Sequence, residues 1–242
     1  MTGRSVVDLV VVPLGGVTAA TIATLMPRLT PDERVRRDRY VREDDRHAFV
    51  VTRALVRAVL SMHGPSTPDA WRFATNAHGC PSVIDAQAGS PRLEFNVSHT
   101  AGLVAMAVVR GHRVGVDVED ARRVVREDLA GRFFAPAEVT DLRGLPVAEQ
   151  PRVFFDYWTL KEAYIKARGM GLAIPLGDFA FVLRPPAAPA ITFVDGFADD
   201  PRRWQFWQAW PTAHHRLGLA VERSGDDLEV RLRTLAAEAL AP

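Results

Sequence analysis

Long helical patterns and short strand patterns occur in two successive sets along the chain, and this order constrains the fold more than any other feature of the sequence. Apolar residues at helical spacing predict one long helix over residues 44–62 and a second over residues 153–168. Short apolar runs on both sides of each helix predict strands. The sets meet near residues 110–112, so we predict an α+β fold with an N-terminal half, 1–110, and a C-terminal half, 111–242.

The remaining elements are shorter. Thr30 followed by Pro31 and two acids is a helix-start pattern, and residues 133–138 look like the start of another helix. We expect the strands to pair mainly antiparallel. The predicted strands are residues 6–13, 71–75, 93–97, 104–109, 114–118, 179–183, 190–194, 204–210 and 217–221.

Bulk composition excludes several classes of protein. The formal net charge is +1, so no overall field attracts nucleic acid or membrane, and neither is expected as a partner. Cys80 is the only cysteine, which excludes a disulfide framework and a multi-cysteine zinc site and favours a cytoplasmic location. No run of about 18 apolar residues occurs, so we expect no transmembrane helix.

Lysine is nearly absent from the chain. Of its 30 basic residues 28 are arginine, and the two lysines, Lys161 and Lys166, share the second long helix. Lysine presents a compact ammonium where arginine presents a planar fork, so a point charge beside a phosphate would favour lysine. Glu162 lies four residues before Lys166. The pair is either part of such a site or a surface ion pair contributing about 0.3–0.5 kcal/mol.

Two carboxylates lie on one face of the strand at residues 114–118 and its continuation. Asp117 and Glu119 are two residues apart, so their side chains point the same way. Adjacent carboxylates repel unless a cation lies between them. Magnesium binds to a few carboxylates together with waters and phosphates. The alternative is a solvated strand end.

Ser98 and His99 follow another predicted strand and offer a hydroxyl, an imidazole and backbone N–H groups to an anion. The alternative is a polar turn whose side chains bond to their own backbone. Neither alternative is excluded by these segments alone.

The motifs gain specificity from their order. The chain contains, in turn, Phe-Asn-Val-Ser-His, Val-Gly-Val-Asp-Val-Glu, Phe-Phe, Trp-Thr-Leu-Lys-Glu-Ala-Tyr-Ile-Lys-Ala and Gly-Met-Gly-Leu. Over residues 30–176 it resembles the Sfp-type 4′-phosphopantetheinyl transferases. The resemblance implies a monomeric pseudo-dimer of two similar α+β halves, with coenzyme A bound in the cleft between them.

The resemblance also implies roles for individual residues. Three carboxylates would hold Mg²⁺, with Mn²⁺ as the alternative, and three of the site residues would be catalytic: Glu162, Lys166 and Asp117. The implied positions are Asp117, Glu119 and Glu162 for the metal, Asp117, Glu162 and Lys166 for the pyrophosphate, and Ser98, His99 and Arg36 for the 3′-phosphoadenosine end.

The implied reaction moves phosphopantetheine from coenzyme A to a serine of an apo acyl or peptidyl carrier protein and releases 3′,5′-ADP. Such carriers serve fatty-acid, polyketide and nonribosomal peptide biosynthesis, and the pathway stays open. Either Glu162 or a metal-bound water held by Glu119 would accept the serine proton. Phosphoryl-type transfer needs mainly positioning and charge neutralisation.

The chain departs from the family pattern at two positions. Cys80 replaces the lysine of a Gly-Lys-Pro segment, which removes one expected phosphate contact. Ala135 replaces a capping serine, which we expect to cost about 1 kcal/mol of helix stability.

Four arginines after the acidic strand form a candidate docking surface for acidic carriers. Its alternative is a solvated basic segment. The four residues are Arg122, Arg123, Arg126 and Arg132.

Two other functions compete with the transferase. A metal-dependent nuclease also uses acids and a lysine, but its lysine normally lies on a strand two residues from an acid. A non-catalytic module would bind coenzyme A or a carrier protein without turnover, and the intact carboxylate set argues against it.

Overall fold

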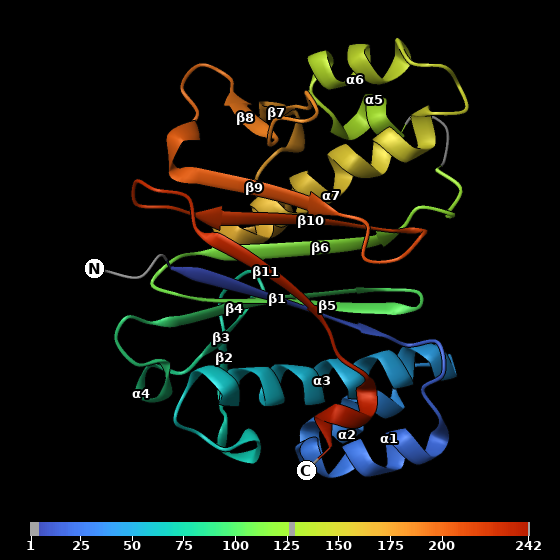
Figure 1. Ribbon diagram of the computed structural model, residues 1–242, viewed down its shortest axis with the longest axis vertical. Coiled ribbons are helices and arrows are strands. Elements are labelled where there is room, and N and C mark those ends of the chain that lie inside the picture. The colour runs from blue at the N-terminus through green and yellow to red at the C-terminus, as the bar shows by residue number, and fades with distance from the viewer. Residues whose placement is uncertain (1–4, 126–128, 242) are drawn as a thin grey trace.

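Two α+β halves stack with their sheets facing each other (Figure 1). The computed structural model describes residues 5–125 and 129–241. The N-terminal half contains a sheet in the order β11-β1-β5-β4, and the C-terminal half a sheet in the order β6-β10-β9. The strands are β1 (Val6–Pro13), β4 (Leu93–Thr100), β5 (Leu103–Arg110) and β11 (Glu229–Thr234), and β6 (Val114–Asp120), β9 (Trp204–Ala209) and β10 (His215–Glu222).

Each sheet is covered on its outer face by one long helix. In the N-terminal half α3 (Glu43–His63) packs against β4 and β5, and in the C-terminal half α7 (Gln150–Arg168) packs across β6 and β10. The smaller elements are α1 (Ala19–Leu25), α2 (Pro31–Asp38), β2 (Phe73–Thr75), β3 (Pro81–Val83), α4 (Asp85–Ala88), α5 (Leu129–Phe133), α6 (Pro136–Arg143), β7 (Phe179–Val182) and β8 (Ala190–Phe193).

The halves are joined by an apolar layer between the sheets. Alternate side chains of β1 and β5, such as Leu9 and Ala105, meet alternate side chains of β6 and β10, such as Val116 and Leu219. These residues are 0% exposed. Because burial of apolar surface is the main favourable term in folding, this layer holds the halves together as one body.

The predicted α+β fold with two halves is confirmed, and every predicted strand and both long helices occur within a few residues of their expected bounds. The sequence patterns did not predict α1, β3 or β11. Antiparallel pairing holds for the other strand pairs, but β11 lies parallel to β1. After β11, Ala237 and Leu240 pack in the core of the N-terminal half. Residues near position 240 therefore pack in the N-terminal half. The division at residue 110 stays a prediction.

Ala135 precedes α6, and its methyl group cannot accept a hydrogen bond from the first backbone N–H groups of the helix. Glu138 supplies the other half of a capping box, because its Oε2 accepts a hydrogen bond from the Ala135 N–H at 2.9 Å. At Ala135 the half of the box that a serine side chain would supply is therefore lost, and the half that Glu138 supplies is kept. No helix in the described part of the chain is long and apolar enough to cross a bilayer.

Lys161, one of the two lysines, is fully buried, and its contacts give it a structural role. Its Nζ lies 2.7 Å from Glu138 Oε2 and donates hydrogen bonds to the carbonyl oxygens of Leu176 and Phe179, both at 2.7 Å. The ammonium has three donors, and each has an acceptor. Burial lowers the pKa of Lys161, while Glu138 raises it. Lys161 thus ties α7 to α6 and β7.

We predict that Lys161→Arg lowers the free energy of unfolding by about 1–3 kcal/mol, because the larger planar fork overfills this site. Lys161→Met should cost about 3–5 kcal/mol, because it leaves the Glu138 carboxylate buried and unpaired. Urea denaturation of the purified variants measures both values. An arginine variant as stable as the parent would contradict the assignment.

Candidate active site

Two glycines set the distance between α7 and the sheet beneath it. A Cβ at Gly115 of β6 would lie 2.0 Å from the Ala163 carbonyl oxygen, and a Cβ at Gly218 of β10 would lie 2.6 Å from the Thr159 backbone. Only glycine permits this approach. The helix therefore lies directly on β6, and its Glu162 and Lys166 lie beside the acidic strand.

Asp117, Ser98 and Lys166 meet at one point. Lys166 Nζ lies 2.6 Å from Asp117 Oδ1 and donates a hydrogen bond to Ser98 Oγ at 3.1 Å. Ser98 Oγ in turn donates to Asp117 Oδ1 at 2.9 Å. Asp117 is 5% exposed, and its Oδ2 has no hydrogen-bond partner among the described residues. Three sequence motifs thus converge on a single carboxylate with one buried oxygen still available.

Glu119 is held by two side chains. Arg123 Nη1 lies 2.6 Å from Glu119 Oε2, and Thr100 Oγ1 donates to the same oxygen at 3.3 Å. Burial raises the pKa of Glu119, the charge of Asp117 raises it further, and Arg123 opposes both effects. Neither Arg123 nor Thr100 was predicted as a site residue.

Glu162 is half-buried, and its pKa is raised well above the usual range of a carboxyl. Burial raises the pKa of Glu162 to about 7, with further contributions from Asp117 and Glu119 that outweigh the opposite effect of Lys166. The mutual electrostatic effects indicate that the three carboxylates face a common region. A cation there would favour their charged forms.

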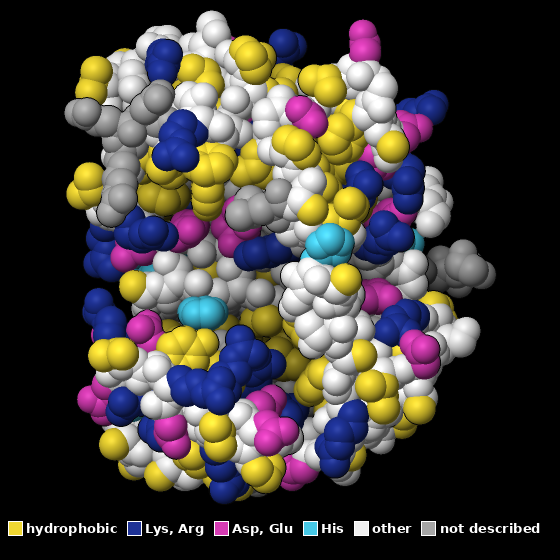
Figure 2. Space-filling model, turned by 180° about the vertical axis from the view of Figure 1, so that it is seen from behind, with side chains coloured by type: hydrophobic (Ala, Val, Ile, Leu, Met, Phe, Trp, Pro, Cys, Tyr) yellow, Lys and Arg dark blue, Asp and Glu magenta, His cyan; other side chains and the backbone are white. Residues whose placement is uncertain are grey.

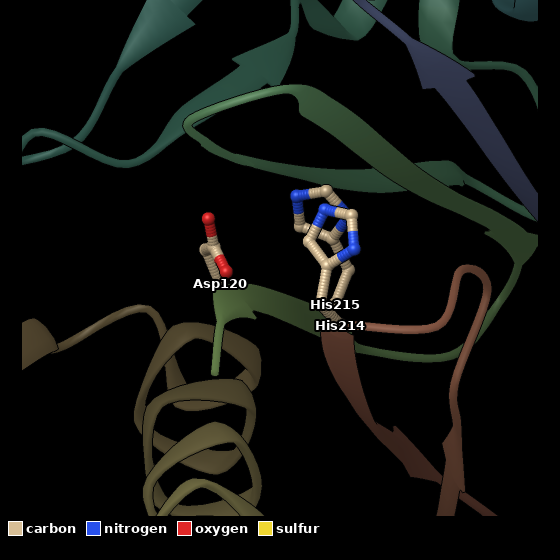
Figure 3. A group of neighbouring side chains, drawn as sticks. All are labelled: Asp120, His214 and His215. Carbon is tan, nitrogen blue, oxygen red and sulfur yellow. The ribbon is translucent and has the colours of Figure 1, made fainter. Parts of the chain in front are cut away.

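The three carboxylates do not form a closed cage. Among the described residues, the one group of three with all ligand atoms within 4.8 Å of one another is Asp120, His214 and His215 (Figure 3). In that group Arg122 donates to both Asp120 oxygens, at 2.9 and 2.7 Å, and both His215 ring nitrogens have hydrogen-bond partners. The group is therefore poorly suited to a metal. Asp117, Glu119 and Glu162 offer the oxygen donors that magnesium prefers.

A series of basic side chains leads away from Lys166 into the N-terminal half. Burial lowers the pKa of His99, and the charges of Lys166 and Arg53 add to this effect. Burial likewise lowers the pKa of Arg53, and the charge of Arg36 contributes. The guanidinium of Arg53 lies 5.0 Å from the Phe49 ring centroid, and that of Arg36 lies 5.9 Å from it. These neighbouring charges suit a polyanion.

Figure 2 shows that Lys and Arg side chains gather around the middle of one face of the molecule, with acidic side chains in the hollow between its upper and lower parts. A cavity of about 780 Å³ lies at the junction of the halves. Arg36 lines a separate hollow of about 660 Å³ on α2. Residues of the larger cavity include His99, Thr100, Ala101, Gly102, Glu119 and Arg123.

The turn between β2 and β3 approaches the end of α7. Asn76 Nδ2 donates to the Gly169 carbonyl at 2.8 Å, and its Oδ1 accepts from the N–H groups of His78 and Cys80, both at 2.9 Å. Burial raises the pKa of the Cys80 thiol, as does Glu94, while Lys166 opposes the increase. Cys80 therefore lies within electrostatic reach of the site.

The structure brings Ser98, Asp117 and Lys166 into direct contact. It places Glu119, Glu162 and His99 around them. Arg36 lies farther away, on α2 beyond Arg53. Arg53 was not predicted. Its signal in the sequence is an arginine four residues after Phe49, on the face of the long helix that is otherwise apolar.

Comparison with known proteins identifies the class. The family described as 4′-phosphopantetheinyl transferase, N-terminal, matches residues 17–110, and the 4′-phosphopantetheinyl transferase superfamily matches residues 113–220. The chain is 36% identical over 183 residues to 4′-phosphopantetheinyl transferase HetI of Nostoc sp., covering 73% of this chain and 76% of that protein. It is 31% identical over 170 residues to 4′-phosphopantetheinyl transferase Sfp of Bacillus subtilis, covering 70% and 73% respectively.

The chain therefore belongs to the 4′-phosphopantetheinyl transferase superfamily, as the motifs predicted. It is an enzyme that transfers 4′-phosphopantetheine from coenzyme A to carrier proteins.

Proposed function

We propose that this transfer takes place where β4, β6 and α7 meet, with the coenzyme A pyrophosphate beside Lys166 and the three carboxylates. The observation that carries the proposal is the contact of Lys166 Nζ with both Asp117 Oδ1, at 2.6 Å, and Ser98 Oγ, at 3.1 Å. The carrier serine oxygen forms a bond to the phosphorus that bears pantetheine. The phosphoanhydride bond breaks, and 3′,5′-ADP leaves.

Magnesium, or manganese as the alternative, would be held by Asp117, Glu119 and Glu162. When bound it would neutralise charge on the pyrophosphate as the anhydride breaks. Two observations support the fit: Asp117 Oδ2 is buried with no partner in the described part of the chain, and Asp117 raises the pKa of both glutamates.

Glu162 is the proposed base for the serine proton. A general base must be free to accept the proton. Arg123 and Thr100 already engage Glu119, which favours Glu162 over a route through Glu119. Glu162 is half-buried on α7, so its orientation is set by the helix packing.

The nucleotide end of coenzyme A is proposed to contact Ser98, His99 and Arg36, and also Arg53. Arg53 Nε is buried and has no hydrogen-bond partner among the described residues, although Glu33 Oε1 lies 3.7 Å away. An arginine in this setting can bind a phosphate through two parallel hydrogen bonds. Arg53 would thus supply positive charge in place of the lysine that Cys80 replaces.

We expect Asp117→Ala, Glu162→Ala and Lys166→Ala each to remove most turnover while the fold survives. The loss at Glu162 should be about 10²–10⁴-fold, the usual contribution of a general base. Mass gain of an apo carrier incubated with coenzyme A and Mg²⁺ measures the rate, and circular dichroism checks folding. Asp195→Ala, at an exposed turn, is the matched control. Near-native rates in all three site variants would refute the assignment.

The same incubation separates the competing functions. A panel of apo acyl and peptidyl carriers tests for transfer, and a labelled DNA or RNA tests for cleavage. Magnesium-dependent cleavage without carrier modification would favour a nuclease. Tight coenzyme A binding without modification of any carrier would favour a binding module.

The arginines after β6 are proposed to dock acidic carriers. Arg122, Arg123 and Arg132 are exposed, and Val124 between them is 92% exposed, so charged and apolar contacts are both offered. Arg126 lies outside the described residues. Cytoplasmic location and a monomeric state stay predictions of the same proposal.

Charge reversal tests this docking surface. Arg122→Glu combined with Arg132→Glu should raise the KM for carrier about tenfold or more, because an attractive pair becomes repulsive at each position. The KM for coenzyme A should stay unchanged. Arg123 is left intact because it contacts Glu119. Steady-state kinetics at several salt concentrations provide the measurement, and an unchanged KM for carrier would exclude this surface.

Cys80 gives a test of the phosphate contact. We expect Cys80→Lys to lower the dissociation constant for coenzyme A by about 3–10-fold through a charge-assisted hydrogen bond. Cys80→Met, which adds length without charge, should not. Titration calorimetry at low and high salt distinguishes the two variants, and equal affinity in both would contradict a phosphate at this position.

A further inference from the structure

His215 connects the two halves at the edge of the proposed active site. It lies at the start of β10 in the C-terminal half and is 3% exposed. Figure 3 shows its ring beside the ring of His214 and near the carboxylate of Asp120. His215 Nε2 lies 2.8 Å from the carbonyl oxygen of Ala101 in the N-terminal half, and its Nδ1 lies 2.7 Å from Thr212 Oγ1.

These contacts fix the tautomer of the ring. A carbonyl oxygen only accepts hydrogen bonds, so Nε2 carries the proton and donates to Ala101. Nδ1 then accepts from the Thr212 hydroxyl, whose oxygen accepts from the His215 N–H at 3.1 Å. Every polar atom of the ring is used within the protein. Burial lowers the pKa of His215, which is consistent with a neutral ring.

The acceptor belongs to the turn that follows Ser98 and His99. Ala101 lies between Thr100, which donates to Glu119, and Gly102, which has φ +85°. A Cβ at Gly102 would lie 3.4 Å from the His215 ring, so the turn rests against the imidazole. The 780 Å³ cavity is lined by this turn.

We propose that His215 is a positioning residue for coenzyme A binding: by holding the Ala101 carbonyl from the opposite half, it keeps Ser98, His99 and Thr100 in register with β6. The inference rests on the proposed function, because it assumes that this turn contacts the nucleotide. A purely structural histidine would contribute to stability alone. A positioning residue also affects the affinity for the nucleotide. In His215 this effect would come from Nε2, which contacts Ala101.

Two amides of different length separate these roles. In His215→Gln the side-chain amide can take the place of Nε2 and donate to Ala101, whereas in His215→Asn it reaches only the Nδ1 position near Thr212. Both replacements lose ring packing and should lower the melting temperature to a similar degree. His214→Gln is the matched control, because the His214 ring centroid lies 4.3 Å from that of His215, with the rings tilted by 42°, and His214 has no hydrogen bond to Ala101 among the described residues.

Binding of 3′,5′-ADP is measured by calorimetry, and KM and kcat for coenzyme A are measured with a fixed apo carrier. For His215→Asn we expect the dissociation constant and the KM to rise about 5–30-fold, the effect of a buried carbonyl left without its donor. For His215→Gln both should stay within about threefold of the parent, and kcat should change little in either variant.

Equal losses in the Gln and Asn variants, or unchanged affinity in the Asn variant, would overturn the proposal. If His215→Asn does not fold, Thr212→Val provides a second test, because it removes the hydroxyl that orients the ring through Nδ1 and so loosens the contact of Nε2 with Ala101. Weaker 3′,5′-ADP binding is then expected, and unchanged binding overturns the proposal. Failure of the parent enzyme to bind 3′,5′-ADP or modify any carrier would instead refute the proposed function itself.

Discussion

The proposed active site depends on the hydrogen-bond partners of the backbone N–H groups along one edge of β6. In place of a neighbouring strand, side chains of alternate residues on β4 accept hydrogen bonds from the β6 backbone, and buried N–H groups require such partners. The pairs are Asn96 with Val116 at 3.0 Å, Ser98 with Val118 at 3.4 Å, and Thr100 with Asp120 at 3.4 Å. Two of these side chains also contact Asp117 and Glu119. The contacts that join the halves therefore also orient the acidic side chains.

The two lysines show how one residue type takes opposite roles on a single helix. Lys161 is 0% exposed and all three of its donors have acceptors, so it can bind nothing else. Lys166 is half-buried, and its contacts are the residues of the site. Five residues separate them, which puts them on different sides of α7. The scarcity of lysine directed attention to α7, but only packing distinguishes the buried structural lysine from the one proposed to act at the site.

The sequence predicts what local pattern determines. Strand and helix periodicity located both halves, and the spacing of Asp117 and Glu119 placed them on one face of β6. Long-range contacts are not encoded in such patterns. The polar alternation of β11 gives no sign that it pairs parallel with β1, more than 200 residues away. Asn76 and His215 likewise contact partners distant in sequence, so these contacts became visible only with the fold.

The distribution of cations explains why the three carboxylates differ. Lys166 contacts Asp117, and Arg123 contacts Glu119, so each of these acids has a cation within 2.6 Å. Glu162 receives only a longer-range effect from Lys166, and burial, together with repulsion from the other two acids, raises its pKa to about 7. A general base must be free to accept a proton, and Glu162 is the one of the three carboxylates without a cation in direct contact among the described residues. The pairing of the other two acids therefore supports the proposal that Glu162 accepts the serine proton.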